Sequence, residues 1–222
     1  MDSPVQEDFI AVLQSAGEGT HLPGTRRRYP RGSTLLNEGD RSERMAIIVS
    51  GQAKVSYFTD EGREVLLAVR GPGDLLGEFA ALDGEPFSAT VTALEDIEAL
   101  MMTVEQFRTV LREEPDVALT LFKTLSRKLR DADRKRVEFA AYDSVGRVAS
   151  RLVELAENFG EDTYDGVRIS LPLSQEELAG WTGSSREAVA KALQSLRNKN
   201  LIETHRRGVT VKDLEGLRAR IK

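Results

Sequence analysis

The sequence has no cysteine and only two histidines, His21 and His205, among its 222 residues. The lack of cysteine excludes disulfide bonds, thiolate zinc sites, thiol redox switches and iron–sulfur clusters held by cysteine. Because the two histidines are far apart in the sequence, a histidine-based metal or haem site is not expected either. We therefore expect no metal site in this protein.

The sequence also lacks a long hydrophobic run. The N-terminal stretch "MDSPVQEDFIAVLQSAG" is acidic, and polar residues interrupt its apolar ones, which is not the pattern of a secretory signal peptide. No run reaches the roughly 20 apolar residues that a membrane-spanning helix needs. We therefore expect a cytoplasmic protein with no membrane partner.

No catalytic motif is present. The sequence shows neither a nucleophile–base set nor a P-loop for nucleotide phosphates. The carboxylates of Glu78 and Asp83 lack a paired acid/base signature that would distinguish them from solvated loop residues. We therefore expect that the protein is not an enzyme.

Basic residues are outnumbered by acidic ones in the first two thirds of the chain and slightly exceed them in the last third. The net charge of the whole sequence is −5, from 31 basic and 36 acidic residues. Residues 144–222 hold 13 basic and 11 acidic residues, a net charge of +2, which leaves 18 basic and 25 acidic residues, a net charge of −7, for residues 1–143. A mildly basic C-terminal part on an acidic N-terminal part is compatible with DNA binding by one end of the protein.

Residues 26–102 have the pattern of an antiparallel β-domain. Short β-branched or apolar runs alternate with turn sequences, as in "MAIIVSGQAKVSYFTDEGREVLLAVRGPGDLLGE". The runs are not separated by the helical segments of roughly 10–15 residues that a parallel α/β sheet requires. The spacing predicts a small antiparallel barrel or roll.

Helical periodicity follows. It predicts helices over residues 104–111 and about 116–142, the second following Pro115 and capped by Asp116. In the second helix Val117 and Leu121 predict that the first turns pack on the domain. A heptad seam, flanked by charged residues, runs along the same helix. The seam residues are Ala118, Phe122, Leu125, Leu129, Ala132, Arg136 and Phe139.

Two interpretations of this seam are open. One is a single helix packed on its own domain. The other is a parallel homodimer, and we favour it because an extended seam is fully buried only against a second copy.

Residues 144–222 have the pattern of a second, compact unit. "VGRVASRLVELAENFG" predicts an amphipathic helix that ends at Gly160, and after an acidic loop "GVRISLP" predicts a strand. Two short helices, a hairpin and a short terminal helix follow. The expected class is α+β, with an N-terminal antiparallel β-roll over residues 1–115, a dimerisation helix and hinge over 116–143, and a C-terminal DNA-binding domain over 144–222.

The most specific stretch, "LPLSQEELAGWTGSSREAVAKALQSLRNKN", has the pattern of a helix-turn-helix. Ser174 and Ser184 each begin a Ser-x-x-Glu capping box that opens a helix. Gly183 lies where the tight turn between the helices needs it. An ordinary surface helix pair with a hairpin is the alternative. The predicted core of the pair is Leu178, Trp181, Val189, Leu193 and Leu196.

The second helix presents polar residues near its N-terminus, where base edges are reached in a major groove. Arginine can bond O6 and N7 of guanine as a bidentate pair, and glutamate can accept from N4 of cytosine. Beyond it, two short strands predict a wing whose arginines contact phosphates. The candidate DNA-binding residues are Ser174, Gln175, Ser184, Ser185, Arg186, Glu187, Lys191, Arg206 and Arg207.

From about residue 20 to residue 215 the chain resembles the CRP/FNR family of bacterial transcription regulators. "SSREAVAKALQSLRNKNLIE" resembles the recognition helix of that family, and "YDSVGRVASRL" resembles its hinge and first DNA-domain helix. "YPRGSTLLNEGD", "IIVSGQAKV" and "GPGDLLGE" resemble its cyclic-nucleotide-binding roll, which is cupin-like or jelly-roll-like.

The resemblance implies a homodimer along the long helix, an N-terminal sensor, and a winged helix-turn-helix that binds palindromic operators in double-stranded DNA. It also implies RNA polymerase as a partner. By position, Arg186, Glu187 and Lys191 match the three residues with which family members read bases. The family often has arginine at the last position, and Lys191 keeps the charge without the planar fork.

The predicted effector pocket departs from the family. Members that bind cyclic AMP have Gly-Glu and, about ten residues later, Arg-Ser or Arg-Thr, with the glutamate on the ribose and the arginine on the phosphate. This chain matches Gly77, Glu78 and Ser88, but Phe87 stands where the arginine would be. Burying a phosphate beside Glu78 without a counter-charge costs roughly several kcal/mol, so classical cyclic AMP recognition is not expected.

The identity of the effector stays open. The alternatives are a regulator that depends on cyclic AMP or cyclic GMP, a different small-molecule ligand beside Phe87, and a roll that serves only as a dimer scaffold. Phe87 either stacks on a ligand or fills the core, and Arg63, Arg70 or Arg130 could supply the missing cation. Ala132 and Asp133 align with residues that contact adenine in the family. The candidate pocket residues are Gly77, Glu78, Phe79, Phe87, Ser88, Ala89, Arg130, Ala132 and Asp133.

Overall fold

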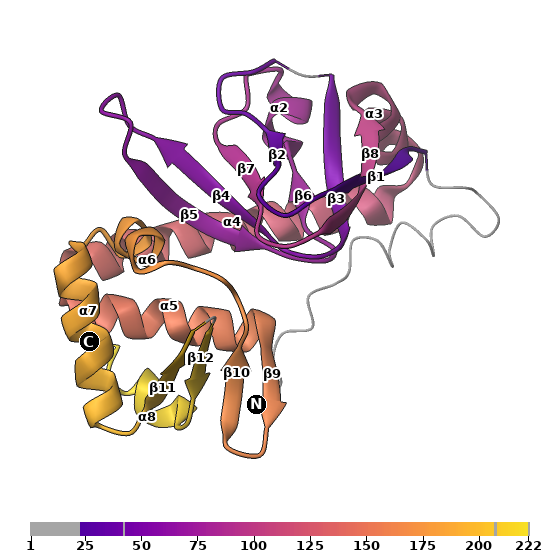
Figure 1. The fold of residues 1–222 in the computed structure, drawn as a ribbon. Coiled ribbons are helices and arrows are strands. Elements are labelled where there is room, and N and C mark those ends of the chain that lie inside the picture. The colour runs from indigo at the N-terminus through magenta and orange to yellow at the C-terminus, as the bar shows by residue number, and fades with distance from the viewer. Residues whose placement is uncertain (1–22, 42, 207, 222) are drawn as a thin grey trace. The chain divides into compact units, whose positions relative to one another are not determined.

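The computed structural model describes residues 23–221 except residues 42 and 207, and these form two compact units (Figure 1). The first unit contains the described chain up to Arg63 together with Leu67–Leu129, and the second contains Glu64–Leu66 and the chain from Arg130 onward. The predicted α+β class is confirmed, because antiparallel sheets are followed by a long helix and a helix-turn-helix domain. None of the helices in the described part of the chain is long and apolar enough to cross a membrane.

The first unit is built from two four-stranded sheets. The strands of these sheets are β1 (Thr25–Tyr29), β2 (Thr34–Leu36), β3 (Arg44–Ser50), β4 (Ala53–Phe58), β5 (Glu64–Arg70), β6 (Leu75–Leu76), β7 (Thr90–Ala93) and β8 (Ile97–Thr103). The first three residues of β5, Glu64–Leu66, are assigned to the second unit. The strand orders are β1-β8-β3-β6 and β2-β7-β4-β5. Neighbours in the first sheet pair antiparallel, as do β2 and β4 with β7.

Strand β3 is buried on both of its faces. Met45 and Ile47 belong to one hydrophobic cluster, and Ala46 and Ile48 belong to another. Successive side chains of a strand point to opposite faces, so the alternation assigns each residue to one cluster. This is why the run "MAIIV" is apolar throughout and does not alternate with polar residues.

A short helix, α2 (Glu78–Asp83), interrupts the strands of the first unit and was not predicted. Gly77 and Gly84 bracket it with φ angles of 78° and 80°, a left-handed conformation that glycine adopts without steric cost. Six residues are too few to show a helical period in the sequence, so this segment carried no helix signal.

Two further helices follow the strands, α3 (Val104–Glu113) and α4 (Pro115–Ala141). The predicted cap at Asp116 is wrong, because α4 begins at Pro115 and Asp116 lies inside its first turn. Proline fits the first helical position, where its missing N–H would have no partner in any case. Val117 and Leu121 are buried with the first cluster, as predicted for the early turns of α4.

Apart from Glu64–Leu66, the second unit begins with the last turns of α4. Its further elements are α5 (Ser144–Phe159), β9 (Gly160–Thr163), β10 (Gly166–Ile169), α6 (Gln175–Thr182), α7 (Arg186–Asn198), β11 (Ile202–His205), β12 (Gly208–Val211) and α8 (Leu214–Arg218). The wing strands β11 and β12 belong to a four-stranded sheet of order β11-β12-β10-β9. The expectation of a loop after α5 is wrong, because this acidic segment forms β9 and pairs with β10.

Gly160 ends α5 as predicted, for a different physical reason than a left-handed turn. Its φ angle is −79°, which any residue adopts. A Cβ atom at this position would lie 2.3 Å from the carbonyl oxygen of Ala156 and 2.3 Å from Val167. Glycine is therefore needed here because β10 approaches the end of the helix closely.

Candidate nucleic-acid interface and effector pocket

Helix α6 begins with the predicted capping box. The backbone N–H of Glu177 donates to the Ser174 hydroxyl at 3.1 Å, and the backbone N–H of Ser174 donates to the Glu177 carboxylate at 2.8 Å. At its other end Gly183, with a φ angle of 56°, turns the chain in the left-handed region. Both signals that defined this helix in the sequence are present.

The predicted capping box at the start of α7 is wrong. The N-cap is Ser185, whose hydroxyl accepts from the backbone N–H of Ala188 at 3.2 Å. The hydroxyl of Ser184 instead donates to the carbonyl oxygen of Thr182 at 3.3 Å, within the turn. Since Arg186 is the first helical residue, the residue directly before it takes the cap position.

The two helices share the predicted core. One face of α7 is turned inward and leaves the opposite face in solvent, as expected for a helix packed on one side. On that opposite face Arg186, Glu187 and Lys191 are all exposed. The buried core residues are Leu178, Trp181, Val189, Leu193 and Leu196.

The carboxylate of Glu187 lies in a cationic, hydrogen-bonded setting. Its own backbone N–H and the Ser185 hydroxyl hold the pKa of Glu187 below its usual value, and Arg186 and Lys191 add to the effect. An ionised carboxylate is an acceptor only, which suits an amino group on a base edge.

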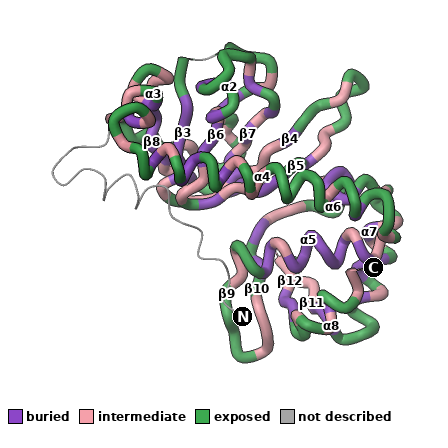
Figure 2. The backbone as a smooth tube through the Cα atoms, turned by 180° about the vertical axis from the view of Figure 1, so that it is seen from behind, coloured by how far each residue is buried: buried purple, intermediate pink, exposed green. Residues whose placement is uncertain are grey.

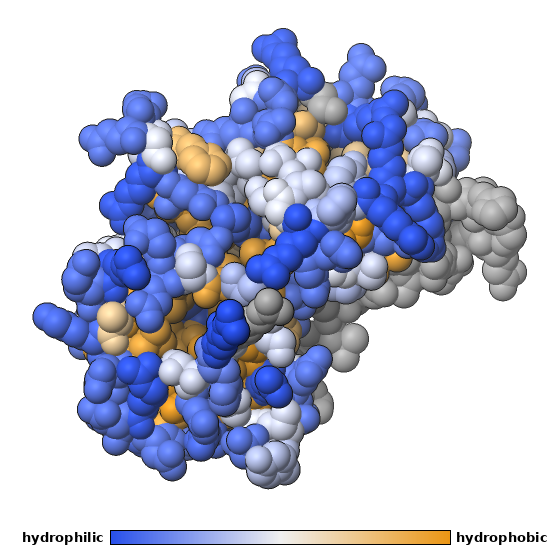
Figure 3. Space-filling model, viewed as in Figure 1, coloured by the Kyte–Doolittle hydropathy of each residue, from blue (hydrophilic) through white to orange (hydrophobic). Residues whose placement is uncertain are grey.

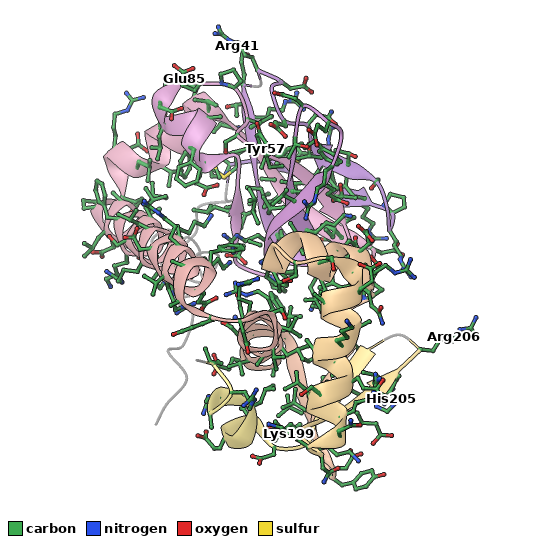
Figure 4. All side chains as sticks on the ribbon, turned by 90° about the vertical axis from the view of Figure 1, so that its left-hand side faces the viewer. Arg41, Tyr57, Glu85, Lys199, His205 and Arg206 are labelled. Carbon is green, nitrogen blue, oxygen red and sulfur yellow. The ribbon has the colours of Figure 1, made fainter. Side chains whose placement is uncertain are left out.

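The exposed face of α7 continues beyond the predicted residues. Gln194, Asn198 and Lys199 line a surface groove together with Lys191. These three residues are not among the predicted ones, although steps of three and four residues from Lys191 lead to Gln194 and Asn198. Figure 4 shows Lys199 near the C-terminal end of α7.

The wing extends between β11 and β12. His205 and Arg206 are exposed, and the Arg206 side chain projects away from the wing tip (Figure 4). The His205 ring nitrogen Nε2 lies 2.9 Å from the Thr210 hydroxyl, which joins the two strands beside the tip. Arg207 lies outside the described residues.

Arg147 on α5 fixes the turn of the helix-turn-helix, a role that no local pattern in the sequence indicates. Its guanidinium donates to the carbonyl oxygen of Thr182 at 2.7 Å and to that of Tyr142 at 2.6 Å. The same group lies over the ring of Phe139, 5.9 Å from its centroid. The end of α4 and the turn before α7 are therefore held by one side chain.

A small cavity of the first unit lies where the effector pocket is predicted. Its volume is about 90 Å³. Ligand pockets usually enclose about 300 Å³ or more. Six of the predicted residues line it, namely Gly77, Glu78, Phe79, Phe87, Ser88 and Ala89.

Phe87 is a core residue of the roll. It is 6% exposed and belongs to the cluster that contains Ala46 and Ile48. A Cβ atom on Gly77 would lie only 2.8 Å from the Phe87 ring, so the ring is packed directly against the backbone of the Gly-Glu motif. The aromatic side chain thus occupies space beside Glu78.

Lys128 on α4 supplies the cation that the pocket stretch lacks. Its ammonium lies 2.5 Å from the Glu78 carboxylate, with side-chain exposures of 16% and 4%. It also donates to the carbonyl oxygen of Leu75 at 3.3 Å and lies 5.8 Å from the centroid of the Phe79 ring. Burial lowers the pKa of Lys128, and the neighbouring Glu78 opposes that shift.

The other cations proposed from the sequence have different positions. Arg70 lines the pocket, whereas Arg63 and Arg130 are exposed and do not line it. Ala132 and Asp133 are also exposed and lie outside its lining. A lysine fifty residues away from Glu78 had no local signal that would have linked the two.

Removing Lys128 alone is expected to destabilise the first unit. In a Lys128→Met variant the Glu78 carboxylate would remain buried without its cation, which costs about 3–5 kcal/mol of unfolding free energy. Denaturant unfolding measures the unfolding free energy of this variant. Lys123→Met, on the exposed side of the same helix, is the control. The double variant Lys128→Met/Glu78→Gln removes both charges of the pair. We expect the double variant to recover most of the loss; equal stability of the two lysine variants would contradict the assignment.

An apolar stripe of α4 is exposed to solvent. Phe122 and Leu129 are each 65% exposed, and Ala132 and Arg136 of the predicted seam are exposed as well. Figure 2 shows α4 in front of the strands of the first unit, exposed or half-buried along most of its length. The view from the opposite side in Figure 3 shows a mainly hydrophilic surface.

Two seam residues are partly used within the chain. Leu125 is half-buried against the first hydrophobic cluster. Phe139 is 49% exposed, and a Cβ atom on Gly183 would lie 2.5 Å from its ring. The exposed stripe is therefore narrower than the heptad seam predicted from the sequence.

A winged helix-turn-helix that follows an antiparallel roll and a long helix defines a two-domain DNA-binding protein. Residues 26–114 match the cyclic nucleotide-binding domain family, and residues 146–220 match the Crp-like helix-turn-helix domain. The sequence is 33% identical over 194 residues, 87% of each chain, to the "CRP-like cAMP-activated global transcriptional regulator" of Mycobacterium tuberculosis.

A second curated relative agrees. The sequence is 31% identical over 186 residues to the "cAMP-activated global transcriptional regulator CRP" of Salmonella typhimurium, which covers 83% of this chain and 88% of the relative. The chain belongs to the CRP/FNR family of transcription regulators. It is a transcription regulator with a Crp-like DNA-binding domain.

Solved structures share the fold. FixK2 from Bradyrhizobium japonicum superposes with a TM-score of 0.79 at 19% identity, covering 90% of this chain and 98% of that one. TTHB099, a transcriptional regulator of the CRP family from Thermus thermophilus, superposes with a TM-score of 0.74 at 25% identity, covering 88% and 96% of the two chains.

Proposed function

We propose that this protein acts as a homodimer that binds two-fold symmetric DNA sites and controls transcription from them by binding and not by catalysis. The observation that carries the proposal is the exposed face of α7, where Arg186, Glu187 and Lys191 stand on a capped helix with a fixed turn before it. These side chains have the chemistry for guanine, cytosine and phosphate contacts. RNA polymerase is the proposed further partner, because transcription regulators act on it.

The homodimer rests on α4. Two bulky apolar side chains one heptad apart, Phe122 and Leu129, stand in solvent on a helix of 27 residues. A second copy of the same helix, in parallel, would cover both side chains in one seam. A dimer with two identical recognition helices matches the symmetry of a palindromic site.

Selection from a pool of random duplexes tests the proposal. We expect an enriched inverted repeat whose half-sites are separated by about 10 base pairs or a multiple, and an affinity that falls steeply with salt. Fluorescence anisotropy with the selected duplex and a scrambled duplex gives the specificity ratio. Equal affinity for both duplexes at physiological salt would refute the proposal.

We further propose that DNA binding does not require a cyclic nucleotide. Phe87 fills the position beside the Gly-Glu motif, and Lys128 neutralises Glu78 from within the chain. The remaining cavity of about 90 Å³ is small for a nucleotide. We therefore propose that Phe87 and Lys128 complete the core of the roll in place of a ligand.

A cyclic AMP-dependent regulator is the second candidate. It is favoured by the names of the relatives from Mycobacterium tuberculosis and Salmonella typhimurium, which are cAMP-activated, and by the presence of Arg70 and Lys128 in the pocket lining. Titration calorimetry with cyclic AMP and cyclic GMP distinguishes the two candidates. Saturable binding with a dissociation constant of about 1 µM, or roughly −8 kcal/mol, would establish the cyclic AMP-dependent regulator. It would overturn the proposal that DNA binding does not require a cyclic nucleotide.

The Phe87→Arg variant is expected to gain affinity for cyclic nucleotides. An arginine here restores a charge-assisted hydrogen-bonding partner for the phosphate, a contact of about 1.5–3 kcal/mol or roughly 10- to 150-fold in affinity. Phe58→Arg, a change on an exposed phenylalanine of β4, is the matched control. No gain in a folded Phe87→Arg variant would show that the missing arginine is not what limits binding.

A further inference from the structure

A cluster of charged side chains is buried where α4 ends in the second unit. Arg151 on α5 is 2% exposed and Glu138 on α4 is 4% exposed, although charged residues are rarely buried unless paired. We call Lys135, Glu138, Ser150, Arg151 and Glu154 the α4–α5 charge cluster. None of these residues belongs to the predicted DNA interface or the effector pocket.

Every charge of this cluster has a partner on the other helix. The Glu138 carboxylate accepts from the Ser150 hydroxyl at 2.8 Å and forms an ion pair with the Arg151 guanidinium. The same guanidinium donates to the Glu154 carboxylate at 2.6 Å. Lys135, one turn before Glu138, completes the cluster with its ammonium 3.3 Å from Glu154.

The cluster also contacts the first helix of the helix-turn-helix. Trp181 on α6 is 3% exposed, and its ring centroid lies 5.6 Å from the Lys135 ammonium and 5.6 Å from the Arg151 guanidinium. Cations over an indole face are attracted to it and orient the ring. The end of α4, α5 and α6 are thus joined at one point, entirely within the second unit.

A buried ion pair is a costly way to stabilise a protein. Well-packed apolar residues in its place are often neutral or stabilising, because both charges must leave water. A charge cluster instead favours one relative orientation of the helices, because its hydrogen bonds are satisfied only in that orientation. The cluster therefore fits a role in geometry better than a role in stability.

We propose that Glu138 and Arg151 are positioning residues that hold α6 and α7 in a fixed orientation on the end of α4. This proposal rests on the homodimer proposed above. If two copies join along α4, the orientation set by the cluster determines the distance between the two recognition helices. The cluster would then select the half-site spacing that the dimer accepts, without touching DNA.

The test uses the double variant Glu138→Leu/Arg151→Met, which removes both charges together and leaves neither unpaired. Its affinity is measured for a single half-site and for full sites in which the selected spacing is lengthened or shortened by one or two base pairs. We expect the wild type to discriminate between spacings by about tenfold or more and the double variant by about threefold or less, since each 1.4 kcal/mol is tenfold. The half-site affinity of the variant is expected to stay within about twofold of wild type, because the reading side chains are untouched.

The proposal would be overturned if the folded double variant kept the spacing preference of the wild type. It would also be overturned if the variant lost affinity equally for the half-site and for every full site. The matched control is Arg218→Met/Glu157→Leu, which removes a half-exposed ion pair of the same unit.

Trp181 is the only tryptophan of the chain, so its fluorescence reports whether the variant is folded around the cluster. If the double variant does not fold, Lys135→Met replaces it: a weakened spacing preference then supports the proposal and an unchanged one overturns it. Failure of the wild type to prefer any symmetric site would refute the proposed function instead.

Discussion

Replacing Arg186 with alanine is expected to cause the largest loss of specific DNA binding. Arg186 is the first residue of α7 and is exposed, where a recognition helix meets base edges. A bidentate pair to guanine provides about 1–3 kcal/mol of discrimination. A dimer makes this contact twice, so the affinity for the selected duplex should fall by roughly 30-fold to 10⁴-fold.

Fluorescence anisotropy on the selected and the scrambled duplex measures this loss. The affinity of the variant for the scrambled duplex should fall only by the contribution of one phosphate-neutralising charge per subunit. Arg168→Ala, an equal change of charge on the exposed part of β10, is the control and should leave the specificity ratio unchanged. An equal loss on both duplexes would show that Arg186 contacts only the phosphate backbone.

The second large effect is expected from placing charges in the exposed stripe of α4. In the variant Phe122→Glu/Leu129→Glu, four apolar side chains of the dimer become four carboxylates that face each other. Full burial of each apolar side chain contributes about 1.5–3 kcal/mol, so the dimer dissociation constant should rise by at least about 10³-fold. Both side chains are already 65% exposed, so the fold of the single chain should be retained.

Sedimentation and DNA binding together measure this effect. We expect a monomer with a wild-type circular dichroism spectrum and an affinity for the full site that falls to that of the half-site. Tyr164→Glu, which places a carboxylate on a fully exposed tyrosine of the second unit, is the control for added charge. A variant that remains dimeric would show that the copies associate through another surface.

The helix-turn-helix was predictable because its signals are local. Its signals all lie within about thirty residues. They are a Ser-x-x-Glu box, a turn glycine and an apolar face at helical spacing, and the structure has helices α6 and α7 where these signals predict them. The error at the second cap has the same origin. Ser184 and Ser185 are adjacent, both can accept from a backbone N–H, and only the path of the turn selects Ser185.

Short elements were harder to predict than long ones. Helix α2 has six residues, and the acidic sequence of β9 is typical of a loop. Neither has a hydrophobic period of its own. Strand β9 exists because β10 offers it hydrogen bonds, which is a property of the partner strand and not of its own residues.

Local patterns in the sequence were enough to predict the order of the domains and the two helices of the helix-turn-helix, because periodicity, capping and turn residues act over a few positions. The departure at Phe87 is also visible in the sequence alone. Only the tertiary structure decided which residues meet: it brings Lys128 to Glu78 and Arg151 to Glu138. Ionic partners separated by many residues attract each other through space, and no local pattern records that distance.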